Sequence, residues 1–318
     1  MMWLTWRQHR HQLFAAFAVL TGLAAAYAGL RAGLSSYVRD SGLRACLELP
    51  DEGCGHLISG LMDRHPGLLN LLPYLNLLPA LIGVFVGATV VTRELDHGTH
   101  RLVWTQSISR DRWLLTKVLM LAVGALAIGA AFGGLNRWFL APYTEGAAVS
   151  AVAENFVGLT GVAPAAAALF AFALGAAAGA LLRRPLPAMA LTLIVFVAAR
   201  LAWESLRYRL VPPLHTIVER AAVVPSGPGR TDWILPLSPW VDAGGAPISD
   251  AALTGLCGQT PTKQAFLDCL SSHDVHQVVY WEPASRYWTF QWLDVAAFGS
   301  AAILLLAVTI MLSRPGRG

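Results

Sequence analysis

The sequence has little charge. Only 13% of its 318 residues are Asp, Glu, Lys or Arg, against about 25% in typical soluble domains, while 55% are hydrophobic. This composition excludes an ordinary water-soluble enzyme and an intrinsically disordered chain. The net charge of +4 comes from 23 basic and 19 acidic residues scattered along the chain, so we expect no nucleic-acid binding.

Cysteine is scarce, and a nucleotide-binding loop is missing. Four Cys are too few for a disulfide-dense secreted scaffold. An ATPase of the P-loop type needs the spacing G-x-x-x-x-G-K-[ST], whose backbone N–H groups and Lys hold the phosphates, and the sequence has none. We therefore expect this chain to bind no cofactor, so that any ATP and Mg would be bound by another chain.

Long apolar runs are what the sequence has instead. A helix that crosses the hydrocarbon core of a bilayer, ~30 Å thick, needs about 20 mostly apolar residues. Six runs meet this length, which predicts an all-α integral membrane protein with six transmembrane helices. The fifth run ends near Arg200, which must either extend toward the surface or pair with Glu204. The runs are Leu13–Leu30, Gly67–Val91, Leu114–Leu135, Phe156–Leu182, Leu186–Trp203 and Val295–Leu312.

Basic residues in the short connections predict the orientation, because they accumulate on the cytoplasmic side. One side collects eleven Lys and Arg and the other side five, so both termini are predicted to be cytoplasmic. The richer side holds Arg7, Arg10, Arg93, Arg101, Arg110, Arg112, Lys117, Arg183, Arg184, Arg314 and Arg317, and the poorer side Arg31, Arg39, Arg44, Arg64 and Arg137.

All four cysteines then fall outside, where disulfides persist. Cys46 and Cys54 share the first outer loop, and Cys257 and Cys269 share the last. We expect pairing within each loop, although four Cys permit three connectivities and the alternative is four free thiols.

The predicted chain has two parts. Residues 1–12, with two Trp one helical turn apart beside basic residues, suit a cytoplasmic interfacial helix that lies on the membrane surface. Residues 13–318 form the six-helix transmembrane domain, with outer loops at 34–66 and 204–291. The second outer loop precedes the last helix, and its Pro and Gly residues predict a compact irregular extracellular domain with short helices.

Glycine and proline give further signals inside the runs. Gly-x-x-x-Gly motifs begin at Gly83, Gly129 and Gly175, and such motifs let helix backbones approach closely, within one chain or across a dimer. Asn76 lies between two prolines of the second run, where hydrogen bonding between helices is its expected use.

The cytoplasmic loop at 92–113 contains residues that typically begin and end a short helix. Gly98 suits the left-handed residue after a helix end, and Thr99 can cap the helix that follows, at 100–106. Ser109 is a second candidate cap, for the helix that continues into the third run. The loop thus predicts a short helix that joins two spans and faces the cytosol.

Several short motifs follow one another in this region: Arg93-Glu94, Gly98-Thr99, Trp104-Thr105-Gln106-Ser107, Ser109-Arg110 and Lys117. In this order they resemble the loop of the membrane subunits of type-2 ATP-binding-cassette (ABC) exporters. The opening Trp3–Arg10 is also similar to the start of actinobacterial members of that family. The first outer loop is larger than in many relatives.

The resemblance implies a permease subunit in the plasma membrane, not itself catalytic, which exports a hydrophobic or amphipathic substrate. It implies a homo- or heterodimer of permease protomers that docks two separate ABC ATPase subunits. The loop would be the coupling helix; the simpler interpretation is a solvated basic loop with ordinary helix caps. The residues that would face the ATPase are Arg93, Glu94, Gly98, Thr99, His100, Arg101, Trp104 and Arg110.

Other functions fit the sequence less well. An ion-coupled transporter usually keeps carboxylates or His inside its helices, and the six runs have none at their centres. His9, His11, His97 and His100 have no Cys or paired carboxylates near them at the spacing of metal ligands, so no metal is expected. The cluster His273-Asp274-x-His276 lacks a nucleophile motif and is interpreted as polar surface. The alternative function is a non-transport integral membrane protein, either a sensor or assembly scaffold or a membrane enzyme.

Overall fold

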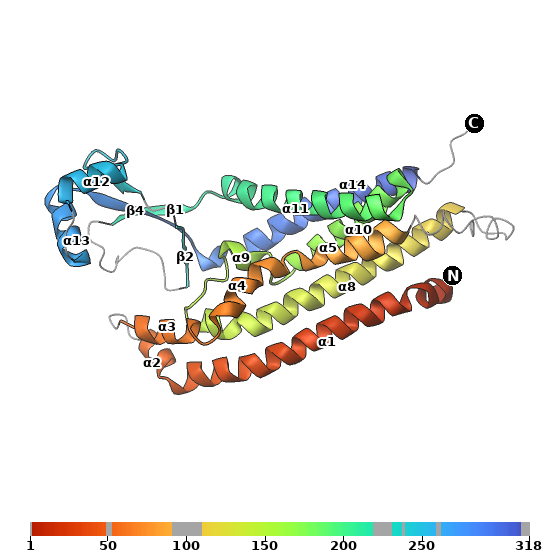
Figure 1. Cartoon of the computed structure of the whole chain (residues 1–318), viewed down its shortest axis with the longest axis horizontal. Helices are drawn as coiled ribbons and strands as arrows, with labels where there is room; N and C mark the ends of the chain where they lie inside the picture. The colour runs from red at the N-terminus through yellow and green to blue at the C-terminus, as the bar shows by residue number, and fades with distance from the viewer. Residues whose placement is uncertain are drawn as a thin grey trace.

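The computed structural model describes residues 2–48, 53–90, 110–218, 231–236, 239–258 and 262–312. Within these ranges, six helical segments are long and apolar enough to cross a membrane, which confirms the number of predicted spans. Figure 1 shows the long helices side by side, with a smaller outer segment beyond one end. The six segments are Arg10–Asp40, Leu69–Val90, Leu115–Glu145, Ala163–Leu182, Pro185–Leu210 and Ala284–Leu312.

The first and third spans are single long helices, α1 (Met2–Asp40) and α8 (Arg110–Glu145). Residues 2–12 are the first turns of α1, continuous with the span, so their position on the membrane surface stays a prediction. Beyond α1, the short helices α2 (Leu43–Glu48) and α3 (Gly55–Met62) lie in the loop that is predicted to be the first outer loop.

The second span is interrupted. It consists of α4 (Pro66–Leu75), α5 (Leu78–Ile82) and a π-helical turn, η1 (Gly83–Gly87). Pro73 lies inside α4 and Pro79 is the second residue of α5, and each lacks the N–H that a continuous helix needs.

The fourth predicted span was wrong at its start. The short helix α9 (Glu154–Val157) ends at Gly158, and α10 (Ala163–Leu182) begins only after Gly161, which adopts a left-handed conformation at φ +67°. Gln291 Oε1 accepts from the N–H groups of Val162 and Ala163 at 2.8 and 2.9 Å, so a side chain from the last span caps α10.

The remaining spans are α11 (Pro185–Leu210) and α14 (Tyr287–Leu312), the second preceded by a 3-10 turn, η2 (Ala284–Arg286). Both are longer than the predicted runs. They pack with α8 and η1 around α10, which is buried over almost its whole length.

The outer segment between α11 and α14 contains a small antiparallel sheet, which the sequence analysis did not predict. The long strand β4 pairs with β1 on one side and with β2 and β3 on the other. The elements of the segment between α11 and α14 are β1 (Leu214–Val218), β2 (Trp233–Ile234), β3 (Trp240–Val241), α12 (Asp250–Cys257), α13 (Lys263–Ser272) and β4 (His276–Glu282).

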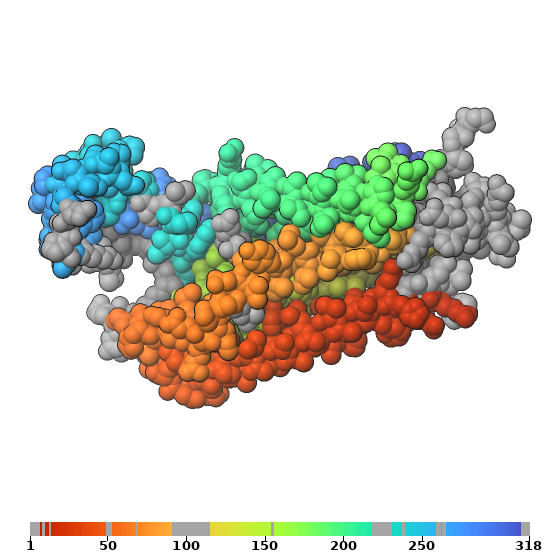
Figure 2. Space-filling view, in the orientation of Figure 1, coloured from red at the N-terminus to blue at the C-terminus, as the bar shows by residue number. Residues whose placement is uncertain are grey.

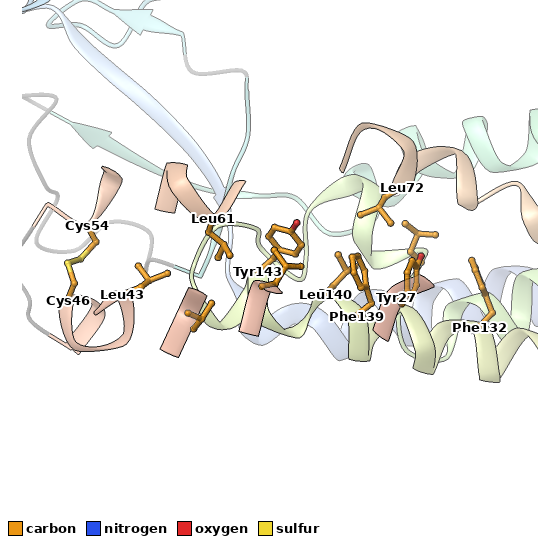
Figure 3. Packing of buried hydrophobic residues seen from close by; sticks show 13 residues of the cluster. Tyr27, Leu43, Cys46, Cys54, Leu61, Leu72, Phe132, Phe139, Leu140 and Tyr143 are labelled. Carbon is orange, nitrogen blue, oxygen red and sulfur yellow. A yellow bond between two sulfur atoms is a disulfide. The ribbon is translucent and has the colours of Figure 1, made fainter. Parts of the chain in front are cut away.

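Both disulfides are local, as predicted. Cys46 pairs with Cys54 and Cys257 with Cys269, and the second bond ties α12 to α13. Figure 3 shows the Cys46–Cys54 bond at the end of an apolar cluster that continues to Tyr27 and Phe132. The disulfide thus anchors the first outer loop to the core shared by α1 and α8.

Small residues let the second span and α10 approach closely. A Cβ at Gly83 or Gly87 would collide with backbone carbonyls of α10, and a Cβ at Gly175 would collide with the backbone of Gly83. The Gly-x-x-x-Gly motifs at Gly83 and Gly129 therefore serve contacts within the chain, the latter against the start of α10.

We predict that Gly83→Ala destabilises the bundle, because the new methyl group meets rigid backbone. The free energy of unfolding, measured by SDS titration in mixed micelles, should fall by about 1–3 kcal/mol. Gly134→Ala is the matched control, since a Cβ there meets open space on α8. That change should be neutral or stabilise by up to about 1 kcal/mol. If both variants lose the same free energy of unfolding, the close contact of Gly83 with α10 does not contribute to stability.

Candidate functional site

The predicted coupling segment lies largely outside the described residues. Arg93, Glu94, Gly98, Thr99, His100, Arg101 and Trp104 all fall in the range 91–109, and only Arg110 is placed, as the first residue of α8. The role of these residues stays a prediction. The structure does describe the two elements that the segment joins, which are the end of the second span at Val90 and the start of α8.

The second span and α8 form walls of an apolar cavity of about 830 Å³, through residues between Leu78 and Thr89 and between Met120 and Phe132. The third wall is α1, and α10 and α11 contribute Ala168 and Met189. In Figure 2 the seam between α1 (red) and the second span (orange) runs along the long axis of the molecule, with α8 behind it. Residues that line the cavity include Ala16, Val19, Leu23, Ile82, Phe85, Val86, Val123, Ile128 and Phe132.

Polar groups in the cavity wall gather near the N-terminal end of α1. His11 and Gln12 lie there, and Gln12 Nε2 donates to the carbonyl of Phe85 at 3.2 Å. Thr89 Oγ1 donates to the same carbonyl at 2.7 Å. The rest of the lining is almost entirely apolar. A cavity of this volume and chemistry can hold a hydrophobic group, because small-molecule sites usually span about 300–1,000 Å³ and are mostly apolar.

The wall formed by the second span carries its irregular turn. Single π-helical turns inside helices are frequent at functional sites. Here the turn η1 spans Gly83–Gly87, and the predicted coupling loop begins at 92, five positions after Gly87. The carbonyl of Phe85, which two side chains bind, belongs to this turn.

Four charged side chains form a second polar site between α11 and α14. Arg200 Nη2 lies 3.1 Å from Glu204, Arg207 pairs with the same carboxylate, and Arg207 Nη1 lies 3.5 Å from Asp294. Trp203 Nε1 also donates to Asp294, at 2.6 Å. Arg207 and Asp294 are fully buried, so their charges depend on these partners.

This network corrects one sequence-based conclusion. Because α11 and α14 extend beyond the predicted runs, Glu204 and Asp294 lie inside membrane-competent helices, which therefore do contain carboxylates. Of the two fates expected for Arg200, pairing with Glu204 is confirmed. The signal that could have revealed the site is the spacing of Arg200, Glu204 and Arg207, which places all three on one helix face.

Asn76 joins the network to the break in the second span. Its Oδ1 accepts from Arg200 Nη2 at 3.2 Å, which confirms the expected hydrogen bond between helices. Two arginines and two carboxylates thus balance one another and link three spans. Both carboxylates have arginine partners, an arrangement that clamps helices together.

A further ion pair ties the outer sheet to the end of the bundle. Glu282, fully buried at the end of β4, pairs with Arg286 at 2.9 Å, and Arg286 donates to the carbonyl of Pro212 at 3.0 Å. Burial raises the pKa of Glu282, and the charges of Arg286 and Arg207 oppose that rise. This strand end therefore lies within the electrostatic reach of the network.

In the His273 cluster, His273 and Asp274 are exposed and His276 is half-buried. His276 Nε2 lies 3.2 Å from Asp274, whose side chain is 70% exposed. The sulfurs nearest to His273 belong to the Cys257–Cys269 disulfide, and disulfide sulfurs are not the thiolates that bind metals.

Comparison with known proteins adds one finding. A family model described as "ABC-2 membrane transporter related" matches residues 17–207, more than half of the chain. No curated protein and no solved structure gives a significant match.

We predict strong coupling between Arg207 and Asp294. Asp294→Leu alone should lower the free energy of unfolding by about 3 kcal/mol, because it leaves a buried arginine without one of its partners. Adding Arg207→Met should recover much of this loss, which a double-mutant cycle measures in mixed micelles. Asp40→Asn, in the exposed pair with Arg39, is the control and should cost less than about 1 kcal/mol. If the losses of unfolding free energy in the two single variants simply add in the double variant, Arg207 and Asp294 are not coupled.

Proposed function

This chain belongs to the ABC-2 membrane transporter related family, and we propose that it is the permease subunit of an exporter driven by a separate ABC ATPase. The observation that carries the proposal is the family match over 17–207, which includes most of the first span and the four that follow. The sequence supports a separate motor, since it has no phosphate-binding loop. ATP and Mg would bind to that partner.

The cavity supports a route for coupling. The segment 91–109 joins the π-helical turn to α8, and both line the cavity. If the ATPases hold this segment, their closure pulls on two cavity walls at once. Such a movement changes the shape of the cavity and exposes it to alternate sides of the membrane.

The chemistry of the cavity supports a hydrophobic or amphipathic substrate. Its lining offers apolar surface along most of its length and hydrogen-bonding groups at one end. The neighbouring face of α1 exposes Phe14 and Phe17, at 59% and 69%, and suits contact with lipid or with a second protomer. We propose a dimeric assembly in the plasma membrane, with both termini cytoplasmic.

The coupling assignment is tested by copurification. Glu94→Ala with Arg101→Ala should reduce the ATPase recovered with this chain about tenfold or more, since interface anchors carry most of the binding energy. Arg184→Ala is the matched control, an exposed basic residue in the next loop predicted to be cytoplasmic. If the double variant keeps full ATPase binding and stimulated ATP hydrolysis, segment 91–109 is not the contact.

The orientation is tested by labelling thiols. After mild reduction of intact cells, a reagent that cannot cross the bilayer should label Cys46, Cys54, Cys257 and Cys269. A fifth thiol from Ser313→Cys, near the C-terminus, should react only after the cells are opened. Protection of Cys257 and Cys269 in intact cells would place the sheet inside and refute the topology.

A further inference from the structure

A small basic pocket lies at the end of the α1–α8 seam away from His11. Its volume is about 250 Å³, and it is distinct from the apolar cavity. Helices α1, α2 and α8 all contribute to it. The residues that line it are Arg31, Ser35, Val38, Arg39, Arg44, Pro142 and Glu145.

The pocket lies at the depth of a membrane surface. Arg31 follows His11 by 20 residues of continuous helix, about 30 Å, which is the thickness of the hydrocarbon core. The Arg31 guanidinium lies 4.8 Å from the centroid of the Trp138 ring and donates to the Trp138 carbonyl. Trp138 is 44% exposed, as is typical of tryptophans at the membrane–water boundary.

Positive charge exceeds negative charge in this pocket. Three guanidinium groups line it, against one carboxylate. Arg44 pairs with Glu145 at 2.9 Å and Arg39 with Asp40 at 3.2 Å, but both pairs are exposed, so they are weak and can rearrange. Three of the five arginines on the side poor in basic residues therefore converge on one place.

We propose that this pocket binds a phosphate group presented at the membrane surface, as in the headgroup of a phospholipid. Guanidinium groups bind phosphate through paired, charge-assisted hydrogen bonds. The pocket volume suits a headgroup and leaves acyl chains to lie beside Trp138. The same guanidinium groups would also accept a soluble phosphate ester, and the experiment below distinguishes a lipid headgroup from a soluble ester. The site does not depend on the transport proposal.

The test is native mass spectrometry of the intact protein, purified in a neutral detergent and titrated with a short-chain phosphatidylglycerol. Arg39→Ala with Arg44→Ala should weaken binding about tenfold or more. Arg64→Ala, which removes an outer arginine stacked on Tyr37, is the matched control and should leave binding unchanged. Glu145→Gln should strengthen binding severalfold, because it frees Arg44, and a gain of this kind does not arise from misfolding.

A parallel titration with glycerol phosphate identifies the source of the phosphate. Tighter binding of the lipid supports a headgroup, and equal binding supports a soluble ester. The proposal is overturned if neither ligand binds, if the double variant and Arg64→Ala behave alike, or if Glu145→Gln weakens binding.

Discussion

The close contact of α10 with its neighbours is the interaction on which the bundle depends. Lipid gives helices no hydrophobic reason to associate, so they must gain energy from van der Waals packing and internal hydrogen bonds. In the apolar 18-residue stretch of α10, 78% of the residues are buried, whereas in the corresponding stretch of α1 only 6% are buried. The molecule therefore has a dense part around α10, where Ala and Gly let backbones approach, and a first helix whose apolar surface is mostly exposed.

The cavity lies at the boundary between the densely packed helices around α10 and the more exposed first helix. It opens where the tightly packed second span faces α1, which lies against α8 along much of its length. The stacked rings of Tyr27 and Phe139, with centroids 4.1 Å apart, and the Tyr27–Asn136 hydrogen bond of 2.8 Å hold α1 to α8 beyond the cavity. The described contacts of α1 are thus made mainly with α8, and the cavity lies where α1 faces the second span.

The sequence predicts what depends on average chemistry over many residues. Six spans and two local disulfides follow from apolar runs and loop placement, and the structure confirms both. The helix ends do not follow, because tertiary partners decide them. Gln291 caps α10 from another span, and Asp294 inside α14 is stabilised by Arg207 and Trp203 of α11. The strands β2 and β3 could not be predicted, because they have only two residues each and depend on pairing with β4. The strands β1 and β4 are longer, and their β-branched and aromatic residues are a signal that could have revealed them. The predicted ATPase-facing residues fall mostly in 91–109, outside the described ranges, and their role stays a prediction.

The two arginine-rich sites differ in a way that assigns them different roles. Between α11 and α14, two arginines meet two carboxylates, and Arg207 and Asp294 are fully buried. Charges in that setting are already neutralised, and opening the site to an ion would cost the pairs that hold it together. At the end of the α1–α8 seam, the guanidinium groups outnumber the carboxylates of the pocket, and the ion pairs there are exposed to water. Rearranging such pairs costs little, since screening by solvent leaves them weak. The buried site therefore suits a fixed joint between helices, whereas the exposed site keeps the capacity to bind an anion.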